Sequence, residues 1–167
     1  KETFSFWHCV GECTAKKEYK EGLTLSGNRP SHGIGGGMCQ MTNLIHWMVL
    51  HSALTITEHH HHGRFDLFPD FGRQVPFGTG TSIVYNYLHY RVENRTSDTY
   101  QLVITTTDRY LRGELRCDRP QPLKFHIYEQ ISGFSWEEDG AYRHNVVRLK
   151  AIDKKKRQGR LRSGADR

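Results

Sequence analysis

The 167-residue sequence lacks a long hydrophobic run, which argues against a membrane-spanning helix in this chain. Its longest apolar stretch, Leu44–Leu50, is interrupted by His46 and is far shorter than the roughly 20 residues that a span requires. The chain starts at Lys1 rather than Met, and no signal-peptide pattern follows. We therefore expect native residues before Lys1 to hold any targeting information.

Most of the chain also lacks net charge. The sequence has 24 Lys and Arg against 18 Asp and Glu, a formal net charge of +6. Residues 150–167 hold eight of those cations and two of the anions, so the rest of the chain holds 16 of each. This neutral body argues against nucleic acid as a partner. We expect residues 151–167 to form a basic, disordered tail behind one domain of residues 1–150.

Cysteine is scarce, because the chain has only four: Cys9, Cys13, Cys39 and Cys117. Four cysteines are too few for a disulfide-dense secreted scaffold, although three pairings are open. The Cys-x3-Cys spacing of Cys9 and Cys13 also permits a zinc site, with His60 and His62 as further ligands. Zinc is therefore the one cofactor that the sequence leaves open, beside the alternatives of a disulfide or unrelated thiols.

Apolar residues recur at helical spacing after a glycine-rich segment. Residues 26–37 have the composition of a loop. Met41, Leu44 and Met48 then share one face of a helix with a period of 3.6 residues. The pattern predicts a helix from about Met38 to His51 that is buried on most of its sides.

Most of the chain after this helix alternates between apolar and polar residues, which predicts strands. The expected strands are Ala53–Glu58, Thr81–Val92, Thr99–Thr107, Tyr110–Cys117, Leu123–Ile131 and Ala141–Lys150. A turn at Glu138–Gly140 precedes the last of them. The predicted fold class is α+β: one buried helix, with Cys39 at its N-terminus, packed on a mostly antiparallel β-sheet.

The position of Cys39 favours a reactive thiol. A helix N-terminus lowers a cysteine pKa, and the N–H groups of Cys39 and Gln40 could hold an oxyanion. The glycines before the helix, Gly36 and Gly37 among them, allow another backbone or a peptide substrate to approach closely. The alternative is a buried and inert cysteine, a common fate of this residue type.

A cysteine nucleophile needs a base, and histidine is abundant. The chain has 11 histidines, and His59–His62 are consecutive after Glu58. In an extended segment His60 and His62 would share one face, so at most two of the four can serve one site. A cysteine on a helix facing a histidine on a strand is, by analogy, the papain-like arrangement.

A set of short motifs forms a more specific pattern: Thr3–Trp7, Gly35–Gln40, Asn43–Leu44, Glu58 with the histidines, Phe68–Asp70, Pro76–Gly78, Tyr85–Tyr87 and Gly113–Arg116. This pattern extends over roughly residues 2–150 and resembles the VanW family, named after an accessory protein of some vancomycin-resistance clusters. The resemblance implies a bacterial protein of the cell envelope. It also implies cysteine-dependent acyl transfer on peptidoglycan stem peptides, of the L,D-transpeptidase type.

The resemblance places the nucleophile on Cys39 and the motif histidine, four residues after Glu58, on His62. The chain departs from the family at His59, where an Arg is usual, and at Gly63, where a Ser is usual.

The family often has an Asp near Gly78–Thr81, and this chain has none there. The third catalytic group stays open among Glu58, Asp66 and Asn86.

These considerations define a predicted site. The catalytic residues are Cys39, His62, Gln40 and Glu58, and the substrate-binding residues are Gly36, Gly37, Asn43, His60, Asp66 and Asn86. The expected partner is peptidoglycan or its precursors. The alternative is a non-catalytic wall-binding module, with or without zinc, whose exposed aromatic residues are Phe68, Phe71, Phe77, Tyr85 and Tyr87.

Overall fold

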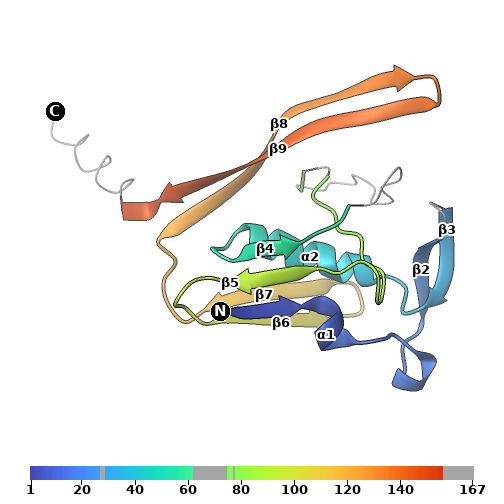
Figure 1. Ribbon diagram of the computed structural model, residues 1–167, viewed down its shortest axis with the longest axis horizontal. Helices are drawn as coiled ribbons and strands as arrows, with labels where there is room; N and C mark the ends of the chain where they lie inside the picture. Colours follow the sequence, from blue (N-terminus) through green and yellow to red (C-terminus); the bar gives the residue numbers. More distant parts are fainter. Residues whose placement is uncertain (27–28, 62–74, 77, 156–167) are drawn as a thin grey trace.

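The computed structural model describes residues 1–26, 29–61, 75, 76 and 78–155, and in this part all strand pairs are antiparallel (Figure 1). A three-stranded sheet has the order β1-β5-β4, with bounds Glu2–Ser5, Arg91–Asn94 and Thr55–Glu58. Three hairpins follow: β2-β3 (Glu21–Ser26, Arg29–Ile34), β6-β7 (Tyr100–Thr106, Leu111–Cys117) and β8-β9 (Leu123–Glu137, Gly140–Asp153). The α+β class is thus confirmed, but within the described ranges the predicted single sheet is replaced by four smaller ones.

The 13-residue helix α2 (Met38–Leu50) is the central element of the body. Only Gln40 among its residues is exposed, which confirms the prediction of a helix buried on most sides. Ile45 and Val49 join a core that also contains Phe6, Trp7, Ile83, Tyr90 and Val92. Two of these, Phe6 and Trp7, belong to the short helix α1 (Phe6–Val10), and a 3-10 turn, η1 (Ala15–Lys17), follows it.

A different face of α2 packs on the β6-β7 hairpin. A Cβ atom at Gly113 in β7 would lie 2.6 Å from Met48 Cε and 3.1 Å from Leu44 Cδ2, so the absence of a side chain there permits the contact. Two residues of the predicted apolar stripe therefore cover β7. No described helix has the length and apolar character needed to cross a membrane.

The segment predicted as a loop at 26–37 is mostly a strand instead. Residues Arg29–Ile34 form β3, which pairs with β2 from Glu21↔Ile34 to Ser26↔Arg29. The glycine content wrongly predicted a loop, because Gly33 lies within a strand opposite Gly22 and not in a turn.

The predicted strand at Thr81–Val92 is also wrong for most of its length. Residues 84–88 form a turn closed by the bridge Val84↔Leu88, and β5 begins only at Arg91. The alternation of apolar residues there arises because Ile83 and Tyr90 are buried in the core while the turn between them is exposed.

The β8-β9 hairpin is longer than predicted and projects beyond the elements that surround α2 (Figure 1). Its turn lies at Glu138 and Asp139, where the sequence placed it, and a register shift between Glu129 and Ile131 interrupts β8. Strand β9 continues to Asp153. The predicted domain boundary at 150 stays a prediction, and the predicted basic tail lies largely outside the described residues.

Candidate functional site

The turn before α2 is held close to β2. A Cβ atom on Gly36 would overlap the backbone of Gly22, and one on Gly35 would overlap Cys13 Cβ. The Gly37 N–H donates to the Leu23 carbonyl at 2.9 Å, and Gly37 caps α2 with φ at 90°. The backbone that Gly36 admits is therefore the chain's own, whereas Gly37 faces open space where a side chain would be.

Cys39 is the second residue of α2 and is half-buried. Its thiol donates to the Ile83 carbonyl at an Sγ···O distance of 4.0 Å. Burial raises the pKa of the Cys39 thiol, and the backbone contacts of Ile83 and Cys39 itself lower it by less. The expectation of a lowered pKa is therefore wrong, since desolvation outweighs the backbone hydrogen bonds that lower the pKa of the thiol.

The predicted oxyanion donors are only partly available. The Gln40 N–H donates to the Gly37 carbonyl at 2.9 Å, so it is engaged in the first turn of the helix. The Cys39 N–H is hydrogen-bonded to its own sulfur, and this contact lowers the pKa of the thiol. The Gln40 side chain is exposed and lies at the same end of α2.

One face of α2 carries buried polar residues. Cys39, Asn43 and His46 follow one another at spacings of four and three residues, and Thr42 borders the same face. Thr42, Asn43 and His46 are only 0%, 6% and 4% exposed. The apolar stripe does not predict this polar one, although the i, i+4, i+7 spacing of Cys39, Asn43 and His46 is a signal in the sequence.

The segment 79–83 lies against this face and runs opposite to the helix. Asn43 Oδ1 accepts hydrogen bonds from the Thr81 N–H at 2.6 Å and the Thr81 hydroxyl at 2.9 Å. The Thr42 and Thr81 hydroxyls also share a hydrogen bond. Asn43 thus holds the segment in place, and its own Nδ2 is a buried donor that has no partner among the described residues.

The histidine run begins at the far end of the same face. The His59 ring stacks on the His46 ring of α2 with a centroid distance of 4.2 Å, and His59 Nε2 bonds the Gly80 carbonyl at 3.1 Å. The Ser82 N–H donates to the His60 carbonyl at 2.7 Å. His59 and His60 therefore lie along the segment 80–82, which leads to Ile83, the residue that contacts Cys39.

Both stacked histidines are held neutral. Burial, with the neighbouring His59 and His61 as smaller causes, lowers the pKa of His46 to about 3. Burial also lowers the pKa of His59. His46 Nδ1 is hydrogen-bonded to the Tyr90 hydroxyl at 3.1 Å, so the pair is anchored in the core.

Glu58 and His60 form a separate group at the edge of the three-stranded sheet. Glu58 Oε1 bonds His60 Nε2 at 3.0 Å and the His89 N–H at 3.2 Å, while Oε2 pairs with Arg91 at 3.0 Å. The hydrogen bond with His60 is the largest cause that lowers the pKa of Glu58. These contacts join Glu58 to β5 and to His60, so its carboxylate has partners other than Cys39.

The remaining predicted residues fall in two places. Asn86 is at the tip of the exposed turn 84–88, three residues after Ile83, with a left-handed φ of 59°. The others lie outside the described residues: Asp66, His62, Gly63, Phe68, Phe71 and Phe77.

The zinc site stays a prediction. All four cysteines are free thiols, Cys9 is exposed, and Cys13 packs against Gly35. Within the described ranges no three His, Cys, Asp or Glu side chains are grouped so that they could hold a metal ion. His62, one of the proposed ligands, is not among those residues.

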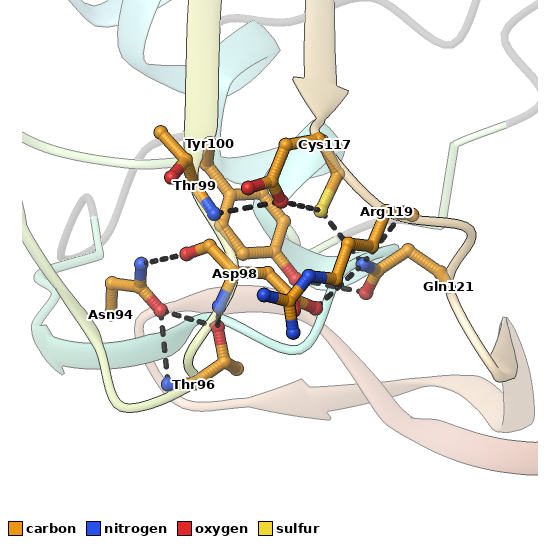
Figure 2. Close-up of polar contacts among 9 residues, drawn as sticks. Asn94, Thr96, Asp98, Thr99, Tyr100, Cys117, Arg119 and Gln121 are labelled. Carbon is orange, nitrogen blue, oxygen red and sulfur yellow. Dashed lines mark hydrogen bonds and ion pairs between the residues drawn. The ribbon is translucent and has the colours of Figure 1, made fainter.

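A second polar network joins the ends of β5, β6 and β7 (Figure 2). Asn94 Nδ2 donates to the Asp98 carbonyl at 2.7 Å, and Asn94 Oδ1 accepts from the Thr96 N–H at 3.0 Å. Gln121 Nε2 donates to Cys117 Sγ at 2.9 Å and the Tyr100 hydroxyl donates to Gln121 at 2.8 Å. This network closes the β5-β6 turn and joins Cys117 to it.

Comparison with known proteins identifies relatives of the chain. The family model described as "VanW like protein" matches residues 1–116. The chain is 32% identical over 146 residues to the Vancomycin B-type resistance protein VanW of Enterococcus faecalis (strain ATCC 700802 / V583), an alignment that covers 87% of this chain and 53% of that protein. It is 33% identical over 79 residues to the uncharacterized protein YoaR of Bacillus subtilis (strain 168), covering 47% of this chain and 26% of YoaR.

The aligned part of the chain thus spans about half the length of its VanW relative and about a quarter of the length of YoaR. No solved structure matches it significantly.

Proposed function

The chain belongs to the VanW family, and from this premise we propose that it is a resistance-associated protein of the cell envelope that transfers acyl groups on peptidoglycan stem peptides. Cys39 is the nucleophile in this proposal. The proton acceptor is a histidine of the run that begins at His59, with His62 in the position that the family motif favours.

The reaction follows from thiol chemistry. The histidine takes the Cys39 proton while the sulfur attacks a carbonyl carbon of the stem peptide. The amide C–N bond breaks, the amine leaves with the proton from the histidine, and a thioester remains on Cys39. A second amine then attacks the thioester to form a new amide and restore the thiol, whereas attack by water gives hydrolysis.

One observation carries the proposal: His59 and His60 lie along segment 80–82, which leads to Ile83. The Ile83 carbonyl accepts a hydrogen bond from the Cys39 thiol. The papain-like pairing of a helix-borne cysteine with a histidine requires this convergence. Because the pKa of Cys39 is raised, its thiol is largely protonated near neutral pH. In this proposal the histidine must therefore act as a general base.

The test is to trap the thioester. The 167-residue chain is incubated with a disaccharide-tetrapeptide from peptidoglycan, and the intact protein is weighed by mass spectrometry. We expect a covalent adduct in the wild type and in the control variants Cys9→Ala and Cys117→Ala, but none in Cys39→Ala. An adduct of equal yield in Cys39→Ala would contradict the assignment.

A non-catalytic wall-binding module is the second candidate, and the hydrogen-bonded thiol with its raised pKa favours it. In that case the wild type and Cys39→Ala bind the disaccharide-tetrapeptide equally well, and neither forms an adduct. Alkylation by iodoacetamide separates the candidates further. An inert Cys39 reacts far more slowly at pH 7 than the exposed Cys9, whereas a base-activated Cys39 reacts faster.

A further inference from the structure

The turn beside Cys39 exposes two tyrosines on a rigid support. Tyr87 is 77% exposed and Tyr85 is 37% exposed, with Asn86 between them. Tyr85 follows Ile83 by two residues, so its Cα lies within about 7 Å of the Cα of the residue that contacts the Cys39 thiol. The aromatic turn therefore directly follows the residue whose carbonyl accepts a hydrogen bond from the Cys39 thiol.

The turn is fixed from both ends. The Tyr87 and Leu88 N–H groups donate to the Val84 carbonyl at 3.0 Å and 2.9 Å. Asn86 adopts a left-handed φ of 59°, which asparagine tolerates better than most residues. The turn can therefore hold its side chains outward at little further cost in conformational entropy.

The aromatic ring of Tyr85 is supported from the core. The Trp7 ring meets it edge to face at a centroid distance of 5.4 Å, and the Trp7 indole N–H donates to the Leu88 carbonyl at 3.0 Å. Phe6 in turn contacts Trp7 at 5.1 Å. A buried pair of aromatic residues thus fixes the orientation of a partly exposed one.

We propose that Tyr85, Asn86 and Tyr87 bind an amino sugar of the glycan strand, so that the substrate of Cys39 is a glycan-linked peptide rather than a free one. This inference rests on the proposed function. The apolar C–H face of a pyranose ring packs on the negative face of an aromatic ring. The Asn86 amide, which both donates and accepts, suits the hydroxyl and acetamido groups of such a sugar.

The test measures binding rather than turnover, so it does not depend on the chemistry of Cys39. Isothermal titration of the Cys39→Ala chain compares the disaccharide-tetrapeptide with the free tetrapeptide. We expect the disaccharide form to bind about tenfold more tightly or better, since truncation of a contact residue at a binding centre commonly has effects of this order. Equal affinity for the two, or binding of neither, would overturn the proposal.

Variants locate the effect. Tyr87→Ala should lower affinity for the disaccharide-tetrapeptide about tenfold and leave the free peptide unaffected, while Tyr87→Phe keeps the ring and retains the affinity. Tyr110→Ala is the matched control, because Tyr110 is 61% exposed in the β6-β7 turn. Loss of affinity in Tyr110→Ala equal to that in Tyr87→Ala would overturn the assignment.

The two proposals fail in different ways. If the wild type forms no adduct at Cys39 but the sugar preference is measured, the acyl-transfer proposal is wrong and the sugar site stands. If Cys39 is acylated equally fast by the free and the disaccharide-linked peptide, the sugar site is wrong and the nucleophile stands.

Discussion

Helix α2 buries polar side chains, whereas the β8-β9 hairpin exposes aromatic ones. On α2, Thr42 is fully buried and Asn43 is 6% exposed, while on β8 Phe134 is 72% and Trp136 is 84% exposed. Buried polar groups are stable only with specific partners, and an exposed side chain has few partners to lose. We infer that the identity of each residue matters around α2 and matters much less along the hairpin.

The sharpest way to test this contrast is a pair of glycine substitutions. Gly36→Ala places a Cβ against the Gly22 backbone, so we expect a loss of about 3 kcal/mol or more of unfolding free energy. Gly133→Ala in β8 meets no atom within 4 Å and has no left-handed φ. It should be neutral or slightly stabilising. Urea denaturation measures both, and equal effects would remove the contrast.

The second test removes the amide that holds segment 79–83. Asn43→Ala leaves the buried Thr81 N–H without its acceptor and removes one partner of the Thr81 hydroxyl, and should cost about 2–3 kcal/mol of stability. Gln40→Ala, at the exposed position of the same helix, should change stability by less than about 0.5 kcal/mol. Thermal unfolding compares the two, and a neutral Asn43→Ala would show that the segment is held by other contacts.

The third test uses pH. The native His46 pKa is about 3, while the unfolded chain titrates near 6.5, so between these values the unfolded state binds a proton that the native state does not. Stability therefore falls as pH is lowered through this window, by up to about 1.4 kcal/mol per pH unit from this one residue. The contribution of His46 to this fall levels off below about pH 3.

Substitution assigns this pH dependence. His46→Phe keeps an aromatic ring against His59 and should flatten the curve of stability against pH between about 6.5 and 3. His126→Phe changes an exposed ring on β8 and should leave the shape of the curve as it is. An unchanged slope in His46→Phe would show that another group causes the acid sensitivity.

The smallest effect is expected at the hairpin aromatics. Trp136→Ala removes the most exposed large apolar side chain and should change the stability of the chain by less than about 0.5 kcal/mol. A clear loss in urea denaturation would mean that Trp136 is covered in solution, and the contrast with α2 would then weaken.

Strong local patterns predicted the elements that the structure contains. The alternation over Thr99–Thr107 and Tyr110–Cys117 became β6 and β7 within one residue at each end, and the apolar stripe became α2. The predictions failed at Arg29–Ile34 and at Thr81–Val92. In the first case Gly33 lies within a strand, opposite Gly22, and not in a turn, and in the second the alternation reflects a turn between two buried residues.

The candidate site shows the same division. The position of Cys39 in the first turn of a buried helix and the family of the chain follow from residues adjacent in sequence. The raised pKa of the thiol does not, because it depends on burial of Cys39 against core residues that are distant in sequence. The assignment of His46 and His59 as a stacked neutral pair likewise required their placement in space.

By itself, then, the sequence determined the elements with a clear period, the nucleophile candidate and the family, since each depends on the order and spacing of neighbouring side chains. Only the tertiary structure decided which polar residues are buried, which glycines are needed for contact, and where His59 and His60 lie relative to segment 79–83. Burial and electrostatic environment are set by segments such as 79–83 and α2, which are far apart along the chain and meet only when it folds.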